Sequence, residues 1–550
     1  MQEISEIQRA RYSYQPKLPA ILKDGLKGIE IVEVGESSSI SDEQALQEIF
    51  SETFAQPFLK INKSDNSNSS SKKLKVGVVL SGGPAAGGHN VIIGLFDALK
   101  QLNSENELIG FRQGPGGIVK GEYLDLTAEV VEPYRNTGGF DMIQSGRTKI
   151  ETPEQFKACL TNCINLKLNA LLVIGGDDSN TNAAMLAQYF KSEGSSVQVV
   201  GAPKTIDGDL KNEYIESSFG FDTACKTYAE LTGNICRDAI SSAKYWHFIK
   251  LMGRSASHIT LEVGLQTQIN STLIGEEIEA QNKTLHDIVD ELSEMIAARA
   301  KKGKNYGVIL IPEGIIEFIP EMGILISALN EMLSDVDSNL NSNELIELAK
   351  KNLKGSLLEL FISLPNNIQS QLVAERDPHG NVQVSLIETE KLLAELVTIA
   401  MEKKKKAGEY NDKFGSITHF FGYEGRCATP SNFDTDYCYS LGQVSGALIQ
   451  AGKTGYIACL KDLDLTSEDW KPMGIPLTSM MNLERRHGKD KPVIKKALVE
   501  LDGEPLKFYN ANKAKWKIED AYIYPGPIQY FGPPEIADKK AISLTLEKTK

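Results

Sequence analysis

The chain has 550 residues, of which 41% are hydrophobic and 24% charged, so it can bury a large core and divide into at least two lobes. Its 59 Lys and Arg residues against 73 Asp and Glu residues give a formal net charge of -14, without a long basic stripe, which argues against a nucleic-acid surface. No stretch approaches the about 20 apolar residues of a membrane span, and residues 1–20 contain no apolar run flanked by basic residues. We therefore expect a cytoplasmic protein that binds no membrane.

Residues 1–72 are expected to form an N-terminal extension, which ends in the polar tract Lys63–Lys73. From Leu74 onward, short apolar runs rich in β-branched residues alternate with helical segments such as Val91–Leu102 and Glu154–Leu168. These runs are Leu74–Leu80, Ala170–Ile174, Val197–Val200, Tyr245–Leu251 and Tyr306–Ile311. The alternation predicts an α/β fold with mainly parallel sheets flanked by helices. Ligands of such sheets bind at the carboxyl ends of the strands, where the candidate site residues are therefore sought.

We expect a first lobe over residues 73–240 and a second lobe over residues 241–550, with C-terminal segments that can return to the first lobe. Between about 318 and 407 the chain becomes helical and highly charged, and this part ends in Lys403–Lys406. The pattern indicates a helical insertion whose lysines form a solvated helix end rather than a binding patch.

The cysteines and histidines do not support a zinc site. The seven cysteines are scattered without paired spacing, which favours reduced thiols. Cys159 and Cys163 lie four residues apart on a predicted helix, but no companion Cys or His pair is near them. The seven histidines include no HExxH or similar group.

The first apolar run leads into Ser81–Asn90, which contains four glycines and precedes a predicted helix. Glycines let the backbone approach an anion closely, and the N–H groups at a helix start point toward it. A tight turn would need only one glycine, so the segment predicts a phosphate-binding loop. It is not a GxGxxG sequence, and a dinucleotide site therefore lacks its fingerprint.

Two further loops bring carboxylates to strand ends. Asp177 and Asp178 follow two glycines at the end of the run Ala170–Ile174, an arrangement that suits magnesium and phosphate. After the run Val197–Val200, the segment 201–209 places Asp207 and Asp209 beside a lysine and a hydroxyl group. This loop can supply a base, a positive charge and a hydrogen bond. An Asp-x-Asp sequence alone is usually a polar turn, but here it accompanies the glycine loop and the paired aspartates.

Together these three loops resemble the phosphofructokinase family, and more narrowly its pyrophosphate-dependent branch of the long type found in bacteria and plants. The resemblance extends from about Lys73 through 423–426 (Tyr-Glu-Gly-Arg), with 252–254 (Met-Gly-Arg) and 312–314 (Pro-Glu-Gly) between them in the family's order. The family phosphorylates fructose 6-phosphate at its 1-hydroxyl group. The resemblance implies two Rossmann-like lobes, Mg²⁺ as cofactor, and pyrophosphate and fructose 6-phosphate as substrates.

The resemblance also implies roles for residues near the donor. Gly83 is expected to contact the donor phosphates through its backbone, Arg147 matches the family's arginine on the donor side, and Asp177 is expected to anchor magnesium. Lys204 adds a cation suited to the transferring phosphoryl group or the leaving phosphate.

On the acceptor side, Asp207 matches the base that takes the proton from the sugar 1-hydroxyl, and Thr205 and Ile206 line the same loop. Asp209 is expected to support the metal or to orient the base. The remaining sugar-binding residues implied by the resemblance are Lys244, Tyr245, Met252, Gly253, Arg254, Glu313, Tyr423, Glu424, Gly425 and Arg426. Of these, Arg426 is expected at the 6-phosphate and Glu313 at the sugar hydroxyls. Lys244 and Tyr245 occupy the place from which the family reaches a neighbouring subunit, which implies a homodimer or a larger homo-oligomer.

The donor is inferred from position 178. ATP-using relatives have Gly-Gly-Asp-Gly at this loop, whereas this chain has Asp178 in the fourth place, and that carboxylate would crowd and repel an α-phosphate. Pyrophosphate has no such group. The alternatives are an ATP-dependent phosphofructokinase, an enzyme for another sugar phosphate, and a noncatalytic regulatory subunit, whose motifs would be damaged. A nicotinamide-dependent oxidoreductase is disfavoured by the missing GxGxxG sequence.

Overall fold

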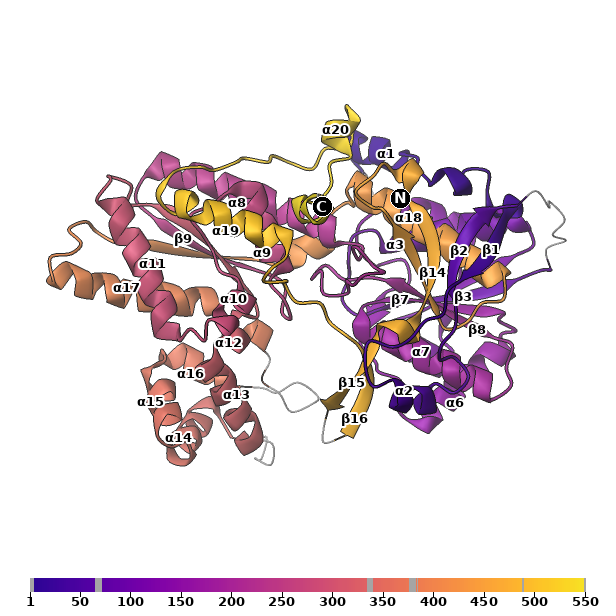
Figure 1. Cartoon of the computed structure of the whole chain (residues 1–550), viewed down its shortest axis with the longest axis horizontal. Coiled ribbons are helices and arrows are strands. Elements are labelled where there is room, and N and C mark those ends of the chain that lie inside the picture. The colour runs from indigo at the N-terminus through magenta and orange to yellow at the C-terminus, as the bar shows by residue number, and fades with distance from the viewer. Residues whose placement is uncertain are drawn as a thin grey trace. The chain divides into compact units, whose positions relative to one another are not determined.

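The computed structural model describes residues 4–64, 72–333, 340–374, 382, 384–486 and 489–548. The chain divides into two compact units, and each is built from segments far apart in the sequence (Figure 1). Among the described residues, unit 1 contains the chain up to Ala224, Glu424–Ala497 and Ile528–Lys548, and unit 2 contains Cys225–Tyr423 and Leu498–Pro527. Residues 65–71 of the polar tract lie outside the described residues. The lobe boundaries expected from the sequence stay a prediction.

Unit 1 contains a large sheet with the strand order β1-β2-β14-β13-β8-β7-β3-β4-β5, and β6 pairs with β3. Its strands are β1 (Ile29–Val34), β2 (Phe58–Lys63), β3 (Lys75–Ser81), β4 (Glu107–Phe111), β5 (Tyr123–Asp125), β6 (Ser145–Gly146), β7 (Ala170–Gly175), β8 (Gln198–Pro203), β13 (Tyr456–Lys461) and β14 (Lys471–Pro476). The central pairs β13-β8, β8-β7, β7-β3 and β3-β4 are parallel, whereas the pairs toward both edges are antiparallel. In Figure 1 the orange β14 lies beside the indigo β2, so the sheet joins the C-terminal and N-terminal parts of the chain.

Helices α3, α4, α7 and α18 contact this sheet. The helices of unit 1 are α1 (Glu6–Tyr12), α2 (Glu43–Ile49), α3 (Gly88–Leu102), α4 (Pro115–Lys120), α5 (Ala128–Val131), α6 (Pro153–Asn165), α7 (Asp177–Ser192), α18 (Asn432–Gln450), α20 (Pro534–Ala537) and α21 (Ile542–Glu547). Every residue of β7 is buried, as expected for a parallel strand with both faces covered. Helix α6 begins with a capping box between Thr152 and Gln155, followed by Pro153 at its first position. Unit 1 also contains the antiparallel hairpin of β15 (Met481–Arg486) and β16 (Lys489–Ile494).

Unit 2 contains a smaller parallel sheet with the order β10-β11-β9-β12. Its strands are β9 (Trp246–Leu251), β10 (Ser271–Thr272), β11 (Gly307–Pro312) and β12 (Ser416–Phe421). Its helices are α9 (His258–Thr267), α10 (Gly275–Ala280), α11 (Leu285–Ala300), α12 (Ile315–Phe318), α13 (Pro320–Leu333), α14 (Ser342–Asn352), α15 (Ser356–Ser363), α16 (Asn366–Val373), α17 (Thr389–Lys406) and α19 (Glu504–Ile518). Helix α8 (Phe221–Ser242) begins in unit 1 and continues into unit 2.

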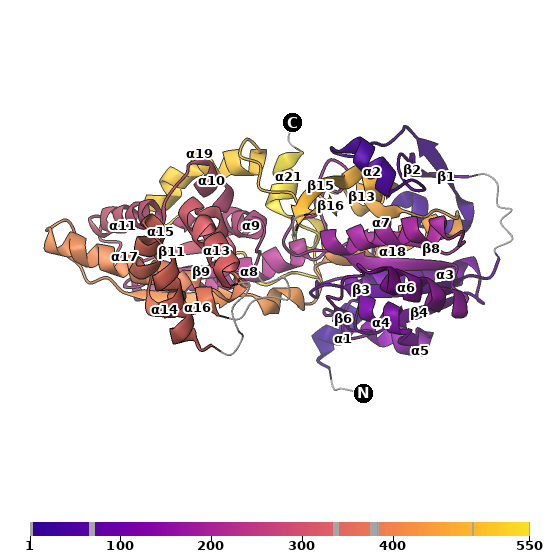
Figure 2. The same cartoon turned by 90° about the horizontal axis from the view of Figure 1, so that it is seen from below.

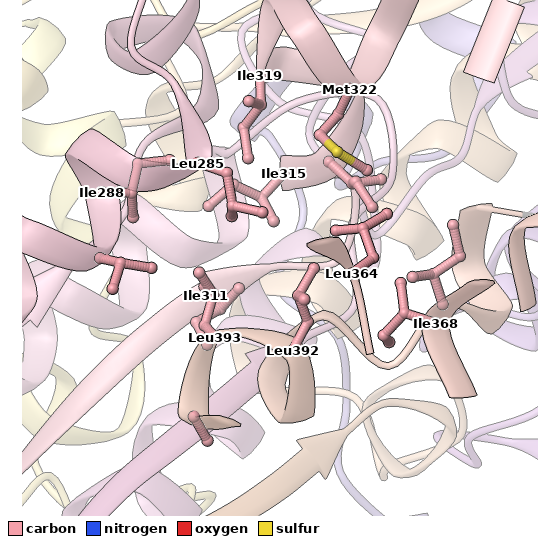
Figure 3. Packing of buried hydrophobic residues seen from close by; sticks show 14 of the residues in the cluster. Leu285, Ile288, Ile311, Ile315, Ile319, Met322, Leu364, Ile368, Leu392 and Leu393 are labelled. Atoms are coloured by element: carbon pink, nitrogen blue, oxygen red, sulfur yellow. The ribbon is translucent and has the colours of Figure 1, made fainter. Parts of the chain in front are cut away.

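The segment expected to be helical contains α13–α17, and α14 packs against α16 (Figure 2). Figure 3 shows how this segment joins the core of unit 2: Ile311 of β11 and Leu393 of α17 belong to one buried cluster with Ile315, Met322 and Ile368. The lysine run ends α17, and three of its four lysines are exposed. The insertion therefore shares its apolar core with the sheet, while its lysine-rich end is solvated as predicted.

The predicted fold class is confirmed. Each of the five apolar runs forms a strand, namely β3, β7, β8, β9 and β11. None of the seven cysteines, all of which are among the described residues, forms a disulfide, and Cys159 and Cys163 belong to the buried core of unit 1. No helix among the described residues is long and apolar enough to cross a membrane.

Candidate active site

The turn after β3 gathers three cationic side chains. A Cβ atom on Gly82 would lie 3.0 Å from Lys204 Nζ, and one on Gly83 would lie 3.2 Å from Arg426 Cζ and 3.6 Å from Arg147 Nη2. Gly82 has a φ of 87°, which favours glycine, and its N–H donates to the Gly146 carbonyl at 2.9 Å. Bare backbone beside three cations suits a ligand with several phosphoryl oxygens.

Lys204 is the buried member of this cluster, with 7% of its surface exposed. The pKa of its ammonium group is lowered to about 8, mainly by burial; Arg426 and Arg147 also lower it, whereas Asp207 and Asp209 raise it. Its backbone N–H donates to the Gly175 carbonyl at 2.9 Å, so the strand end of β7 fixes its position. A bound anion would relieve the repulsion among the three cations.

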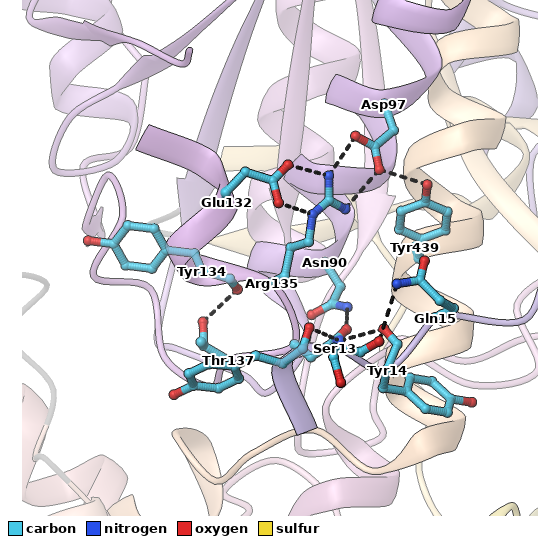
Figure 4. Close-up of polar contacts among 12 residues, drawn as sticks. Ser13, Tyr14, Gln15, Asn90, Asp97, Glu132, Tyr134, Arg135, Thr137 and Tyr439 are labelled. Atoms are coloured by element: carbon cyan, nitrogen blue, oxygen red, sulfur yellow. Dashed lines mark hydrogen bonds and ion pairs between the residues drawn. The ribbon is translucent and has the colours of Figure 1, made fainter. Parts of the chain in front are cut away.

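Arg147 is positioned by a loop that starts in a network of ion pairs (Figure 4). At the start of this loop, Arg135 binds Asp97 of α3 through Nη1 and Nη2 at 2.8 and 2.9 Å, and it binds Glu132 through Nε at 2.7 Å. Tyr439 of α18 donates its hydroxyl to the same Asp97 at 2.8 Å. The loop ends at β6, which pairs with the last residues of β3. Arg147 therefore follows directly after a strand fixed beside the glycine turn.

Asp177 and Asp178 occupy different environments at the start of α7. The side chain of Asp177 is 16% exposed, whereas that of Asp178 is 50% exposed. Burial raises the pKa of Asp177, and the neighbouring carboxylates of Asp178 and Asp209 raise it further. Asp178 Oδ1 lies 3.6 Å from Lys149 Nζ, whereas Asp177 Oδ2 lies 3.7 Å from Lys496 Nζ. The two adjacent carboxylates therefore have different cationic neighbours.

The loop after β8 presents Asp207 and buries Asp209. Asp207 is half-buried and its N–H donates to Thr205 Oγ1 at 3.0 Å, while Ile206 is buried beneath the turn. Gly208 has a φ of 75°, a conformation that favours glycine. Asp209 is 5% exposed, and burial raises the pKa of its carboxyl group. Asp207 is thus the more accessible of the two carboxylates.

The donor side contains carboxylates that fit magnesium. Lys496 Nζ lies 3.7 Å from Asp177 Oδ2 and 3.9 Å from Asp209 Oδ2, so both carboxylates lie beside the same ammonium group. Proteins usually hold Mg²⁺ by one or two carboxylates, with phosphate oxygens and waters as the other ligands. In the described part of the chain, no group of three or more His, Cys, Asp or Glu residues could hold a metal ion alone. This donor set therefore fits a metal that binds together with a phosphate ligand.

In unit 2, the carboxyl ends of three parallel strands are aligned, because Leu251 of β9 pairs with Pro312 of β11 and with Phe421 of β12. The predicted residues 252–254, Glu313 and Tyr423 follow these ends. Gly253 donates its N–H to Glu313 Oε2 at 3.2 Å. A Cβ atom on Gly314 would lie 1.8 Å from the Arg254 carbonyl, so this close approach requires glycine. Glu313 is buried and Arg254 is exposed, which places a fixed carboxylate and an accessible cation at one edge.

Two predicted sugar-binding residues lie elsewhere in unit 2. Lys244 and Tyr245 precede β9, at the end opposite to Met252, and Lys244 Nζ lies 5.2 Å from the Tyr245 ring. The strand between them spans six residues, or about 20 Å at the usual rise of a β-strand. Within one chain, these two residues therefore do not join the edge formed by Arg254 and Glu313.

The predicted sequence 423–426 forms a short 3₁₀ helix. Tyr423 belongs to unit 2 and is 68% exposed, whereas Glu424, Gly425 and Arg426 belong to unit 1. Arg426 lies beside Gly83, with the residues predicted to bind the donor. Its role at the sugar 6-phosphate stays a prediction.

Sequence reasoning missed Lys149 and Lys496. Lys496 follows β16 in the sequence Val-Ile-Lys-Lys, and Lys149 comes two residues after Arg147. Strand β16 (Lys-Asp-Lys-Pro-Val-Ile) has no apolar run that would have marked Lys496, and nothing in the sequence connects this lysine with Asp209 and Asp177, which come 287 and 319 residues earlier.

An α/β fold with cations, carboxylates and bare glycine turns at its strand ends is typical of enzymes that transfer phosphoryl groups. The model of the phosphofructokinase family, described as "Phosphofructokinase", matches residues 75–444. The chain belongs to this family.

Similar proteins match nearly the whole chain. A pyrophosphate--fructose 6-phosphate 1-phosphotransferase from Porphyromonas gingivalis is 51% identical over 99% of this chain and 99% of its own length. One with the same name from Entamoeba histolytica is 50% identical over 99% and 100%. An Arabidopsis thaliana protein named as subunit beta 2 is 51% identical over 98% and 94%, whereas one named as subunit alpha 2 is 39% identical over 99% and 89%.

Among solved structures, a pyrophosphate-dependent phosphofructokinase from Marinobacter aquaeolei superimposes with a TM-score of 0.53 at 15% identity, over 82% of this chain and 93% of that chain. A second, from Nitrosospira multiformis, has a TM-score of 0.51 at 16% identity, over 85% and 97%. These similarities support the fold.

Proposed function

We propose that the chain catalyses the reversible transfer of a phosphoryl group from pyrophosphate to the 1-hydroxyl of fructose 6-phosphate, giving fructose 1,6-bisphosphate and phosphate. The observation that carries this proposal is the convergence of Lys204, Arg147 and Arg426 on the turn at Gly82 and Gly83. The relatives that match nearly the full length, at about half identity, bear names that state the same substrates.

In this proposal, Asp207 accepts the proton of the 1-hydroxyl as that oxygen attacks the nearer phosphorus of pyrophosphate. The bond from this phosphorus to the bridging oxygen breaks, and the bridging oxygen leaves with the inorganic phosphate. Lys204 and Arg147 compensate the negative charge on the donor, and the bare backbone at Gly83 allows its close approach. Arg426, beside the same glycine, is proposed to hold the sugar 6-phosphate. Phosphoryl transfer requires mainly such positioning and charge compensation.

Magnesium, when bound, would offset the negative charge of the donor. Asp177 would hold it, and Asp209 would support it from the neighbouring loop. The carboxylates of Asp177 and Asp209 both lie within 4 Å of Lys496 Nζ, so both face one positively charged group, which supports this assignment.

On the acceptor side we propose that Arg254 and Glu313 bind the sugar phosphate at the strand ends of unit 2. The exposed guanidinium group suits the phosphate, whereas Glu313, fixed by the Gly253 N–H, can accept hydrogen bonds from sugar hydroxyls. Met252, Gly253 and Tyr423 would contribute to the same edge, and Thr205, Ile206, Glu424 and Gly425 would line the loops around Asp207 and Arg426.

The preference for pyrophosphate follows from Asp178. This carboxylate stands at the start of α7 next to Asp177 and would repel the α-phosphate of ATP. An ATP-dependent enzyme would need a small residue at this position. The similarity to relatives named as pyrophosphate enzymes supports the same choice.

We also propose a homodimer or larger homo-oligomer in the cytoplasm. Lys244 and Tyr245 lie at the end of β9 opposite to Arg254, which supports a role in a neighbouring subunit's site. Seven cysteines without a disulfide are typical of a reducing compartment.

The experiment is a comparison of pyrophosphate and ATP as donors, with fructose 6-phosphate and Mg²⁺, for the wild type and Asp207→Asn. We expect turnover with pyrophosphate only, and a loss of about 10²–10⁴-fold in kcat for the variant, which keeps the shape of Asp207 but cannot take up the proton. Binding of fructose 6-phosphate should be retained. Faster turnover with ATP would refute the donor assignment, and a near-normal rate of Asp207→Asn would refute the base.

A further inference from the structure

Lys496 is held in place by the segment that follows the β15–β16 hairpin. The N–H of Ile494 donates to Thr181 Oγ1 of α7 at 3.1 Å, and the N–H of Lys495 donates to the Met480 carbonyl at 3.1 Å. On the other side, the N–H of Ala497 donates to the Asp209 carbonyl at 2.8 Å. The backbone on both sides of Lys496 is therefore tied to the elements that carry Asp177 and Asp209.

The ammonium group of Lys496 lies between these two carboxylates, 3.7 Å from Asp177 Oδ2 and 3.9 Å from Asp209 Oδ2. The carboxylates are 16% and 6% exposed, whereas the lysine side chain is 32% exposed. A buried and a partly buried carboxylate close together repel one another more strongly than in water, so a cation between them removes an electrostatic cost. Because the lysine side chain is more exposed than the two carboxylates, a change of its rotamer costs less free energy than a change of theirs.

We propose that Lys496 is a resident counter-ion of the metal site, which closes the space between Asp177 and Asp209 to free divalent metal until the donor is present. This inference rests on the proposed function, because it assigns magnesium to the same two carboxylates. A divalent ion that enters alone must displace the ammonium group or remain beside a like charge. The donor's oxygens give that ammonium group another partner, so metal and pyrophosphate enter together.

In this proposal Lys496 controls when the metal can bind. Lys204 has a different role, because it lies at the glycine turn where the donor is expected. The role of Lys496 also explains why the two aspartates at the start of α7 have different cationic partners. Lys149 lies beside the half-exposed Asp178, and Lys496 lies beside the less exposed Asp177.

The test measures Mn²⁺ binding, followed by electron paramagnetic resonance of the free ion, to the full-length protein without pyrophosphate. Lys496→Met removes the charge and keeps much of the apolar stem. We expect it to bind Mn²⁺ at least about tenfold more tightly than the wild type, because the positive charge beside the two carboxylate groups is gone. Lys496→Arg keeps the charge and should bind Mn²⁺ as weakly as the wild type.

Two controls locate the effect. Lys495→Met removes an exposed neighbouring lysine and should leave Mn²⁺ affinity unchanged. Adding Asp177→Asn to Lys496→Met should abolish the gained affinity. Equal affinity of wild type and Lys496→Met, or an equal gain in Lys496→Arg and Lys496→Met, would overturn the inference. Failure of the proposed function would instead show as a wild-type enzyme without pyrophosphate-dependent turnover, whatever its metal affinity.

Discussion

Lys204 carries its charge inside the protein, beside the glycine turn and two arginines. A buried ammonium group costs free energy unless a ligand or carboxylate compensates it. At pH values between the lowered pKa of about 8 and the ordinary pKa of 10.5, Lys204 binds more protons in the unfolded chain than in the folded chain. The contribution of Lys204 to stability therefore increases with pH across this window and is unfavourable below it. Such a cost is typical of a site organised for binding rather than for folding.

We expect kcat/KM for pyrophosphate to fall as the pH rises through about 8, because the free enzyme then loses the ammonium group that attracts the donor. The measurement is the pH profile of kcat/KM for the wild type and for Lys204→Arg. The guanidinium group stays charged throughout, so the basic limb should move to higher pH in the variant. If kcat/KM falls at the same pH in both enzymes, the fall is caused by a group other than Lys204.

At the residue scale, the sequence pattern indicates that the carboxylates lie at strand ends, but it does not indicate which cations lie beside them. Asp177 and Asp207 each follow an apolar run and a turn, so local pattern places them at strand ends. Lys496 contacts Asp177 only because β16 packs on α7, and pairings of this kind depend on tertiary structure. The position of Arg426 beside Gly83 could likewise not be predicted from the sequence, because the two residues come together only where the chain returns to unit 1.

At the scale of elements, the central strands were predictable and the edge strands were not. All residues of β7 and β9 are buried, which leaves a continuous apolar run in the sequence. Strand β12 is only partly buried, and β1 alternates weakly, so neither has a comparable pattern. The loops between elements are held by polar contacts, such as those of Arg135, that no periodicity reveals.

Arg135→Met should lower the free energy of unfolding by about 2 kcal/mol, because it leaves the partly buried Asp97 without its charged donors. It should also raise KM for pyrophosphate, since the loop that begins at Arg135 positions Arg147. Urea unfolding and steady-state kinetics measure the two effects. Arg485→Met is the matched control: its pair with Asp490 is exposed, and we expect a change below about 0.5 kcal/mol. A similar loss in both variants would mean that the network contributes nothing specific.

At the scale of the whole molecule, the proposed oligomer can be tested by mixing inactive subunits. In Asp207→Asn the base is lost, and in Lys244→Ala the residue proposed to act in a neighbouring site is lost. A mixed dimer of the two variants contains one site with both residues intact. Random reassortment into two-fold symmetric dimers should therefore restore about a quarter of the wild-type rate.

Each variant alone, taken through the same dissociation and reassociation, is the control and should stay at its own low rate. Mixtures that remain at the average of the two variants would show that Lys244 acts within its own chain or not at all.

The pairing of β14 with β2 also constrains the order in which the protein can be made. During synthesis, β1 and β2 emerge early, yet Lys60 of β2 pairs with Met473 of β14, and β13 completes the parallel part beside β8. The first unit therefore cannot close its sheet until nearly the whole chain has left the ribosome. Until then β8 has an open edge, a feature that invites wrong pairing during slow, long-range folding. Nascent chains stopped before β13 are thus expected to need chaperone protection that the finished protein does not.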